Sequence, residues 1–395
     1  MRYETLILGA GAAGLMCAAH SGGKTLVIDH AKNPGEKIRI SGGGRCNFTN
    51  LHTAPENFLG QNPHFHKSAL ARYTQWDFID LMAQHGLAWH EKTLGQLFCD
   101  TSAKDIVHLL LAEMRRAGAD LWLQTSLRDL THADGTFTAV LERDGQQSTI
   151  TAHNLVLATG GKSIPKMGAT GLAYDIAGKF GHTLTEIRPA LVPLTFSDRR
   201  FADLSGTAVT ARVKLAGTAF DEAVLLTHRG LSGPAILQIS SYWREGDTLD
   251  LDLAPDIDLL GTLRAQRRIQ GRRAITTELS HHLPAKLVSH LTPELKLSGT
   301  LGDQSDATLT ALCQHLHHWS LTPTGSEGYR TAEVTLGGIE THAINSQSMM
   351  SQNLPGLYII GEAADVTGWL GGYNFQWAWS SAVAAGRHID RSFAT

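Results

Sequence analysis

The sequence predicts an α/β fold that is formed by the two ends of the chain and interrupted by an inserted domain. A strand, a glycine-rich turn and a helix open the chain at residues 6–20. Short apolar strands followed by small residues recur at 155–157 and 357–360. Between them, from Pro189 to about Gly325, β-type runs are followed by a helical, histidine-rich stretch. We therefore expect domains at 1–189, 190–325 and 326–395, with the first and third forming one unit.

Length and composition exclude several classes of protein. The chain has 395 residues, of which 42% are apolar and 18% charged, so it is neither disordered nor fibrous and can form two or three domains. Lys and Arg number 34 against 37 Asp and Glu, which leaves a net charge of -3. There is no global positive field, so a nucleic-acid or membrane partner would have to bind a local patch.

Cysteine usage and the N-terminal residues indicate a cytoplasmic protein. The four cysteines are far apart and form no CxxC pair, which fits a reducing compartment. The opening residues contain no export signal. Two uncharged stretches, 5–23 and 366–386, are interrupted by glycines and polar residues, and we expect neither to cross a membrane.

The first element is a βαβ unit. Residues 6–8 and 25–28 read as strands and residues 15–20 as a helix, so a tight turn falls at 9–14. That turn reads Gly-x-Gly-x-x-Gly, and Asp29 ends the second strand, which is typical of a Rossmann-like dinucleotide site. An ordinary glycine turn in an α/β core is the alternative. The expected cofactor contacts are Gly9, Gly11, Ala12, Ala13, Gly14, Asp29 and His30.

The next elements alternate between helices and strands. Apolar spacing predicts helices at about 68–84 and 103–116, and short alternating runs with Asp-Gly turns cover 121–155. In the insert, the runs 208–215 and 248–253 read as strands. A helix is expected to begin at Gly371-Gly372-Tyr373-Asn374 near the C-terminus.

The C-terminal segment favours FAD over a nicotinamide dinucleotide as the resident cofactor. Glu362 follows an apolar strand, where a ribityl chain needs a hydroxyl acceptor, and the free amides after Gly371 can face a flavin oxygen. Two distant segments would then bind one elongated molecule. The alternative is a plain buried helix, because Trp369, Trp377 and Trp379 can all be core residues.

The segment 37–50, Lys-Ile-Arg-Ile-Ser-Gly-Gly-Gly-Arg-Cys-Asn-Phe-Thr-Asn, together with 158–161, 335–339 and 361–362, carries a resemblance. The chain resembles the bacterial FAD flavoprotein family of aminoacetone-oxidase-like and bile-acid-reductase-like enzymes over nearly its whole length. The resemblance implies a two-part FAD domain with an inserted β-barrel plus helical domain. It implies cofactor contacts from Lys37, Ser41, Gly42, Gly43, Gly44, Arg45, Cys46, Asn47, Thr159, Gly160, Gly161, Gly361, Glu362, Gly371, Gly372, Tyr373, Asn374 and Gln376.

Within that family the likeness is densest to members that reduce a uridine of large-subunit ribosomal RNA to dihydrouridine. It is carried by residues 61–65, 67–78, 89–100 and 226–234. This implies RNA as substrate and NADH or NADPH as a transient electron donor. One departure is Phe98-Cys99, where other members read Phe-Pro. The alternatives are a small-molecule flavoenzyme, either an amine oxidase or an ene-reductase, and a non-catalytic FAD-binding assembly factor.

Reduction of the uracil double bond needs a proton at C5 as well as a hydride at C6. A thiol is protonated at neutral pH and can act as general acid, so Cys99 is the first candidate and Cys46 the second. His228 and Arg229 can orient a carbonyl or a phosphate, and Tyr373 can border the flavin. The alternatives are buried thiols that act as small hydrophobes, a structural turn and core packing.

A local basic patch predicts where RNA binds. Residues 261–290 contain six basic side chains against a single carboxylate, Glu278, whereas residues 244–258 are acidic. Exposed aromatic side chains can accept an unstacked base; the candidates are Phe65, Tyr73, Trp76 and Trp89. A solvated helix face is the alternative. The 20 histidines lack the spacing of a zinc site, and no metal is expected. The basic residues are Arg264, Arg267, Arg268, Arg272, Arg273 and Lys286.

Overall fold

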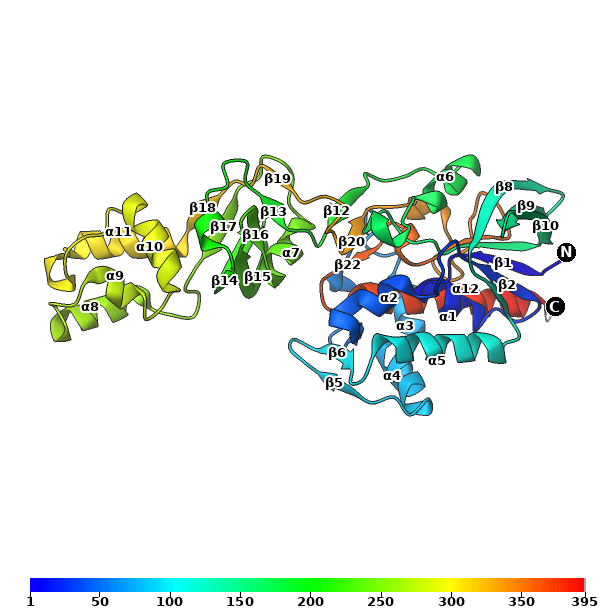
Figure 1. Ribbon diagram of the computed structural model, residues 1–395, viewed down its shortest axis with the longest axis horizontal. Helices are drawn as coiled ribbons and strands as arrows, with labels where there is room; N and C mark the ends of the chain where they lie inside the picture. The colour runs from blue at the N-terminus through cyan, green and yellow to red at the C-terminus, as the bar shows by residue number, and fades with distance from the viewer. Residues whose placement is uncertain (394–395) are drawn as a thin grey trace. The chain divides into compact units, whose positions relative to one another are not determined.

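The computed structural model describes residues 1–393, and the chain divides into two compact units (Figure 1). Unit 1 consists of Met1–Pro189 together with the chain from Val334 onward, and unit 2 consists of Ala190–Glu333. The second division therefore lies later than the expected 325/326. The reason is that strand β19 (Gly325–Ser326) pairs with β13 (Leu194–Thr195), so the chain still belongs to the inserted sheet at that point.

Unit 1 is built on a five-stranded parallel sheet of order β21-β11-β1-β2-β7. Strands β1, β2, β11 and β21 are mostly apolar and buried along their length, as parallel strands covered on both faces must be, whereas the edge strand β7 is exposed or half-buried. The C-terminal strand β21 pairs with β11, so both ends of the chain complete one sheet. The strands are β1 (Thr5–Leu8), β2 (Thr25–Ile28), β7 (Asp120–Trp122), β11 (Asn154–Leu157) and β21 (Leu357–Ile359).

Helices α1 (Ala12–Ala18) and α12 (Tyr373–Phe393) lie side by side in unit 1 (Figure 1). Trp377 and Trp379 of α12 are fully buried, and their indole N–H groups donate to the Gly361 and Phe48 carbonyls. These bonds fix the C-terminal helix against both the N-terminal and the C-terminal segments. The other helices of unit 1 are α2 (Glu36–Ile40), α3 (Lys67–Arg72), α4 (Gln75–Gln84), α5 (Ala103–Arg116) and α6 (Leu172–Lys179).

The single helix expected at 68–84 is two helices, α3 and α4. Thr74 between them has an extended backbone, and its N–H and hydroxyl both donate to the Asp77 carboxylate at 2.6 Å. This is an N-terminal cap for α4, so a new helix begins at Gln75. The expected helix at 103–116 coincides with α5, whose N-cap Ser102 accepts from the Lys104 N–H.

The remaining strands of unit 1 form small sheets around the main one. Strands β3, β6 and β5 make an antiparallel sheet, and β8, β9 and β10 make a meander. Strand β4 pairs with β22. The bounds are β3 (Asn47–Asn50), β4 (Phe58–Leu59), β5 (Trp89–Glu91), β6 (Gln96–Cys99), β8 (Thr125–Ala133), β9 (Thr136–Arg143), β10 (Gln146–Ala152), β12 (Arg188–Ala190), β20 (Val334–Leu336) and β22 (Thr367–Gly368).

Unit 2 contains a seven-stranded antiparallel sheet of order β18-β17-β14-β15-β16-β13-β19, and four of its helices are inserted between β17 and β18 along the chain. Within residues 1–393, no helix is long and apolar enough to cross a membrane. The further strands are β14 (Thr207–Leu215), β15 (Thr218–Leu226), β16 (Gly230–Ser232), β17 (Leu249–Asp252) and β18 (Trp319–Leu321). The helices are α7 (Pro234–Ser240), α8 (Leu259–Ile269), α9 (Ile275–Leu279), α10 (Ala285–Glu294) and α11 (Asp306–His317).

Candidate cofactor and substrate site

The first glycine turn is closed on one side and open on the other. A Cβ on Gly9, which has a φ of 111°, would lie 2.4 Å from the Ala158 carbonyl oxygen, and a Cβ on Gly14 would lie 1.9 Å from the Gly9 oxygen. A Cβ on Gly11 would meet no atom of the described chain within 4 Å. The turn therefore packs tightly against β11 and leaves the Gly11 side free, which fits a bound pyrophosphate.

Asp29 is held for hydrogen bonding at the end of β2. Its two carboxylate oxygens accept from the Ala10 N–H at 2.7 Å and the Ala31 N–H at 2.8 Å. Each oxygen keeps a second lone pair, so Asp29 can still accept from a ribose hydroxyl. The neighbouring His30 lies against Gly168, where an added Cβ would come within 2.1 Å of its Nε2.

Thr159 carries an unsatisfied polar atom at this site. Its Oγ1 is buried and has no hydrogen-bond partner among the described residues, directly after the Ala158 that contacts Gly9. Buried hydroxyls are normally bonded. A dinucleotide with ribose and phosphate oxygens supplies partners for such an atom, so the residues around the turn fit the group that the sequence predicts.

The segment 41–47 contains four left-handed residues; Gly42, Gly43 and Arg45 are exposed and Cys46 is buried. Gly42, Gly43 and Gly44 have φ values of 55°, 65° and 85°, and Cys46, a non-glycine residue, has a φ of 52°. A Cβ on Gly42 would lie 2.7 Å from Cε1 of Phe98, whereas a Cβ on Gly43 would meet no atom of the described chain within 4 Å. One side of the loop is thus packed on β6 and the other is free for a ligand.

The glycine pair before α12, Gly371 and Gly372, contacts the β3-β6-β5 sheet. A Cβ on Gly372 would lie 2.4 Å from the Thr49 carbonyl oxygen of β3. The buried side chain of Asn50, also on β3, donates to the Gly371 carbonyl at 2.9 Å. The structure thereby brings together the predicted segments 41–47 and 371–374, which are far apart in the sequence.

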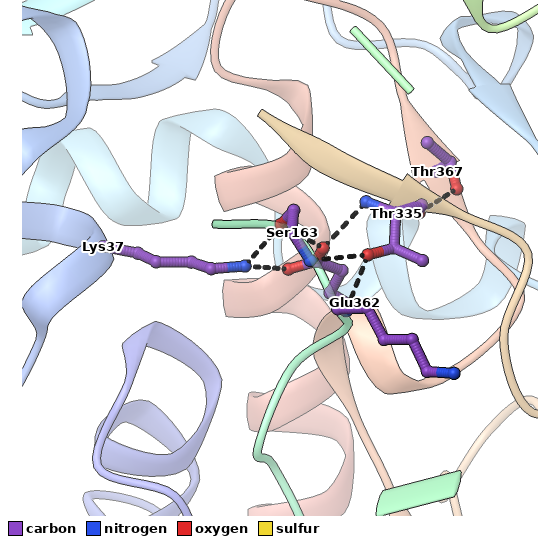
Figure 2. Close-up of polar contacts among 6 residues, drawn as sticks. Lys37, Ser163, Thr335, Glu362 and Thr367 are labelled. Atoms are coloured by element: carbon purple, nitrogen blue, oxygen red, sulfur yellow. Dashed lines mark hydrogen bonds and ion pairs between the residues drawn. The ribbon is translucent and has the colours of Figure 1, made fainter. Parts of the chain in front are cut away.

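Glu362 lies in a network that joins its own segment to three others of unit 1 (Figure 2). Its Oε2 accepts from Lys37 Nζ at 3.0 Å, and its Oε1 accepts from the Thr335 N–H at 2.9 Å and the Ser163 hydroxyl at 3.1 Å. Lys37 Nζ also donates to Ser163 Oγ at 2.7 Å. Burial would raise the pKa of Glu362, but Lys37 and the hydrogen bonds outweigh it and hold that pKa below its usual value.

This network changes the interpretation of Glu362. Three of the acceptor positions of its carboxylate are used by the protein, so its main role is to link segments that contain Lys37, Ser163 and Thr335. Thr335 Oγ1 extends the network by accepting from the Lys162 N–H at 2.8 Å. The sequence did not identify Ser163 and Thr335 as partners of Glu362, because these residues come together only when distant segments of the chain pack against each other.

Three other predicted cofactor contacts turn inward. Gln376 is fully buried; its side chain accepts from Thr49 Oγ1 at 2.6 Å and donates to the Tyr73 carbonyl at 3.0 Å. The Asn374 amide bonds both the N–H and the carbonyl of Gly368 at 2.8 Å. Tyr373 is buried against Phe58 and Trp369. These side chains order the start of α12, because helix starts need partners for their free polar groups.

The structure buries both candidate proton donors. Side chains along β6 point alternately to its two faces. Gln96 lies next to Gly371 and Phe98 next to Gly42, so these two share one face. Cys99 therefore lies on the opposite face, together with the fully buried Leu97. Cys99 is 0% exposed, and its Sγ lies 3.6 Å from Thr101 Oγ1. Burial raises the pKa of Cys46 to about 12, which makes that thiol a poor acid at neutral pH.

His228 and Arg229 form an exposed turn between β15 and β16 of unit 2. The Thr227 N–H donates to the Gly230 carbonyl at 2.8 Å and closes this turn. Arg229 Nη1 lies 3.8 Å from Glu327 Oε1. Both side chains are therefore accessible to a ligand of unit 2, and the Arg229 guanidinium has the Glu327 carboxylate nearby.

The basic patch of unit 2 separates into two sets. Arg264 and Arg267 bond the Asp306 carboxylate at 2.7 and 2.5 Å. Arg273 pairs with Glu278, which is buried. The remaining three, Arg268, Arg272 and Lys286, are exposed and form no ion pair with a described residue. Half of the predicted patch thus braces the helices, and half faces solvent.

The aromatic candidates also separate. Phe65 and Tyr73 are buried in the core, and Trp89 is half-buried. Trp76 in the first turn of α4 is 56% exposed, and it is the one candidate whose ring is freely accessible. Leu94, which sequence reasoning missed, is 60% exposed in the turn between β5 and β6. Gly95 was the available turn signal there, and Leu94 before it is not a residue that such turns favour.

Comparisons with known proteins agree with this geometry. The family model described as the HI0933-like protein Rossmann domain matches residues 3–388. The chain is 48% identical over 400 residues to a protein of Escherichia coli K12 named ribosomal RNA dihydrouridine synthase, covering 98% of each chain. It is 30% identical to the 3-dehydro-bile acid delta(4,6)-reductase of Clostridium scindens, covering 96% of this chain and 97% of that protein.

A solved structure shares the fold at low sequence identity. The 3-ketosteroid-delta4-(5alpha)-dehydrogenase of Rhodococcus jostii RHA1 superposes with a TM-score of 0.53 at 14% identity. The match covers 98% of this chain and 97% of that one, so the α/β architecture with its insert is shared along the whole length.

Proposed function

The chain belongs to the HI0933-like Rossmann family, and from this premise we propose that it is an FAD-dependent oxidoreductase that reduces a uridine of large-subunit ribosomal RNA to dihydrouridine. The observation that carries the proposal is the 48% identity, over 98% of both chains, with the Escherichia coli protein named ribosomal RNA dihydrouridine synthase. The geometry of unit 1 supports FAD, because the Gly11 turn is open, Thr159 Oγ1 lacks a partner among the described residues, and both ends of the chain meet there.

The residues of this chain would bind and orient the two reactants. Reduced flavin, when bound, supplies a hydride to C6 of the uracil ring. The Gly11 turn and Asp29 would hold the dinucleotide, and the open side of the segment 41–47, at Gly43, would contact it. In this proposal Cys99 remains the first candidate for the proton at C5, and its side chain is 0% exposed on the core face of β6. NADH or NADPH would supply the electrons for the next turnover.

RNA binds the solvent-facing part of the basic patch. Arg268, Arg272 and Lys286 are available for phosphates, whereas Arg264, Arg267 and Arg273 are engaged with carboxylates. The cytoplasm, where ribosomal RNA is made and modified, is the expected location.

The test uses an Escherichia coli strain that lacks its own relative of this chain. Expression of this chain should restore dihydrouridine in large-subunit ribosomal RNA, detected by mass spectrometry as uridines with two additional hydrogens. The Gly11→Val variant serves as the matched control that lacks cofactor. Purified protein should also bleach its flavin absorbance on anaerobic addition of NADH or NADPH. Unmodified RNA despite a flavin-loaded protein that NADH or NADPH bleaches would overturn the proposal and favour a small-molecule reductase.

A further inference from the structure

The turn between β5 and β6 presents a large apolar side chain in an unfavourable backbone conformation. Leu94 and Gly95 both have positive φ values, 53° and 76°, and the Gln96 N–H donates to the Thr93 carbonyl at 3.0 Å. This combination is that of a type I′ turn, whose first central position favours Asn or Gly. Leu94 is instead a γ-branched residue with 60% of its surface exposed. Neither the turn nor the core accounts for leucine at this position.

The turn is held rigidly beside the glycine pair of α12. The Asn50 side chain, 1% exposed, donates to the Leu94 carbonyl at 3.1 Å and to the Gly371 carbonyl at 2.9 Å. The Leu51 N–H donates to the Gly95 carbonyl at 2.8 Å, and the Glu91 carboxylate accepts from the Gly95 N–H at 3.1 Å. One buried amide therefore fixes Leu94 next to the segment where we expect the flavin.

The surroundings of Leu94 suit RNA. Lys92, on the same turn, and His52, whose ring contacts Gly95, are exposed and can face phosphates; Glu91, also exposed, is engaged with the turn's own amide. The start of α4, which carries the exposed Trp76, is tied to the chain next to His52, because the Gln75 side chain donates to the Leu51 carbonyl at 3.0 Å. Rigid apolar side chains beside cationic groups are what proteins insert between bases that they unstack.

We propose that Leu94 is a wedge: its side chain fills the gap that is left in the base stack when the target uridine is moved out of it. Enzymes that act on a base in structured nucleic acid must move it out of the stack, and an apolar side chain that replaces it lowers that cost. This inference rests on the proposed function and specifies how the RNA is held. Leu94 is a positioning residue: it contacts neighbouring bases and takes no part in hydride or proton transfer.

The decisive variant is Leu94→Asn, because Asn is the residue that this turn prefers. It should fold with equal or higher thermal stability and normal FAD content, and Leu94→Met should keep the wedge. The probe is a synthetic stem-loop of the Escherichia coli ribosomal RNA segment that carries dihydrouridine, with 2-aminopurine beside the target uridine. Wild type and Leu94→Met should raise its fluorescence on binding, and Leu94→Asn should not.

Dihydrouridine formation provides the second readout. Leu94→Asn should be at least about tenfold slower on the stem-loop, since unstacking costs a few kcal/mol, and close to wild type on an unstructured oligonucleotide that contains the same uridine. Equal fluorescence and equal rates for wild type and Leu94→Asn would overturn the wedge. A fluorescence rise without dihydrouridine would instead contradict the proposed function while leaving the wedge intact.

Discussion

Lys37 Nζ and Glu362 Oε2 lie 3.0 Å apart although the two residues are separated by 325 positions in the sequence. Lys37 is on α2, Glu362 follows β21, and Ser163 and Thr335 bond the same carboxylate. The ion pair therefore ties together the segments that form the two-part domain, and its loss should loosen the cofactor site as well as the fold.

We expect Lys37→Met to lower the stability of unit 1 by about 1–3 kcal/mol, because it leaves the Glu362 charge uncompensated. This is less than the roughly 3–5 kcal/mol that is usual when one partner of a fully buried ion pair is removed, because the Lys37 side chain is 34% exposed. Urea unfolding followed by tryptophan fluorescence measures the change. The surface pair Arg128–Glu142, removed by Glu142→Gln, is the control and should give a smaller effect.

The same network should make stability depend on pH. The pKa of Glu362 is lowered from its ordinary value of 4.5 on folding, so its carboxylate adds stability above about pH 4.5, and that stability is lost as the pH falls through the folded-state pKa. Glu362→Gln should therefore be less stable than wild type at neutral pH, and the gap should narrow in acid. A gap that stays constant down to the acid transition would contradict an ionised Glu362.

Two glycines of the first turn should respond differently to the same substitution. Gly11→Val should fold and yet lack flavin absorbance, because its side chain enters open space that the pyrophosphate needs. Gly14→Val should fail to fold or be strongly destabilised, since its Cβ would overlap the Gly9 carbonyl oxygen. Circular dichroism and the flavin-to-protein absorbance ratio separate the two results. Normal FAD content in Gly11→Val would remove the pyrophosphate from this turn.

Cys99→Ala should keep FAD and its reducibility and lose at least tenfold in dihydrouridine formation if its thiol donates the proton, as general acids contribute about 10²–10⁴-fold. Cys46→Ala is the comparison, because burial raises the pKa of Cys46 to about 12 and makes it the weaker acid. The rates should be measured under single turnover with pre-reduced enzyme. Full activity of Cys99→Ala would assign Cys99 to the core.

The two sets of basic residues in unit 2 predict different salt dependence. Replacing Arg268, Arg272 and Lys286 with Ala should weaken RNA binding and reduce the slope of log K against log salt by about 2, since each phosphate contact on a single strand contributes about 0.7. Replacing Arg264 and Arg267, which bond Asp306, should lower the free energy of unfolding and leave the slope of log K against log salt close to that of wild type. Equal slopes for the triple variant and wild type would exclude these three residues from the interface.

Local patterns were sufficient for the nucleotide-binding part of the fold. The glycine turn at 9–14 and Asp29 could be recognised from spacing alone, because the geometry of a βαβ unit is set by residues close in the sequence. The boundary between α3 and α4 was missed, since the Thr74–Asp77 cap interrupts a continuous apolar spacing. Family membership was also accessible, because its motifs are contiguous.

Partnerships between distant residues were out of reach of such patterns. Whether Glu362 bonds a ligand or Lys37, whether Gln376 faces a cofactor or Tyr73, and which arginines stay exposed all depend on contacts formed after the chain has folded. The residue types indicated polar chemistry and positive charge. The burial and the partners of each side chain then showed whether it stabilises the fold or is free to bind a ligand. The physical reason is that hydrogen bonds and ion pairs act over a few ångströms in space, irrespective of separation along the chain.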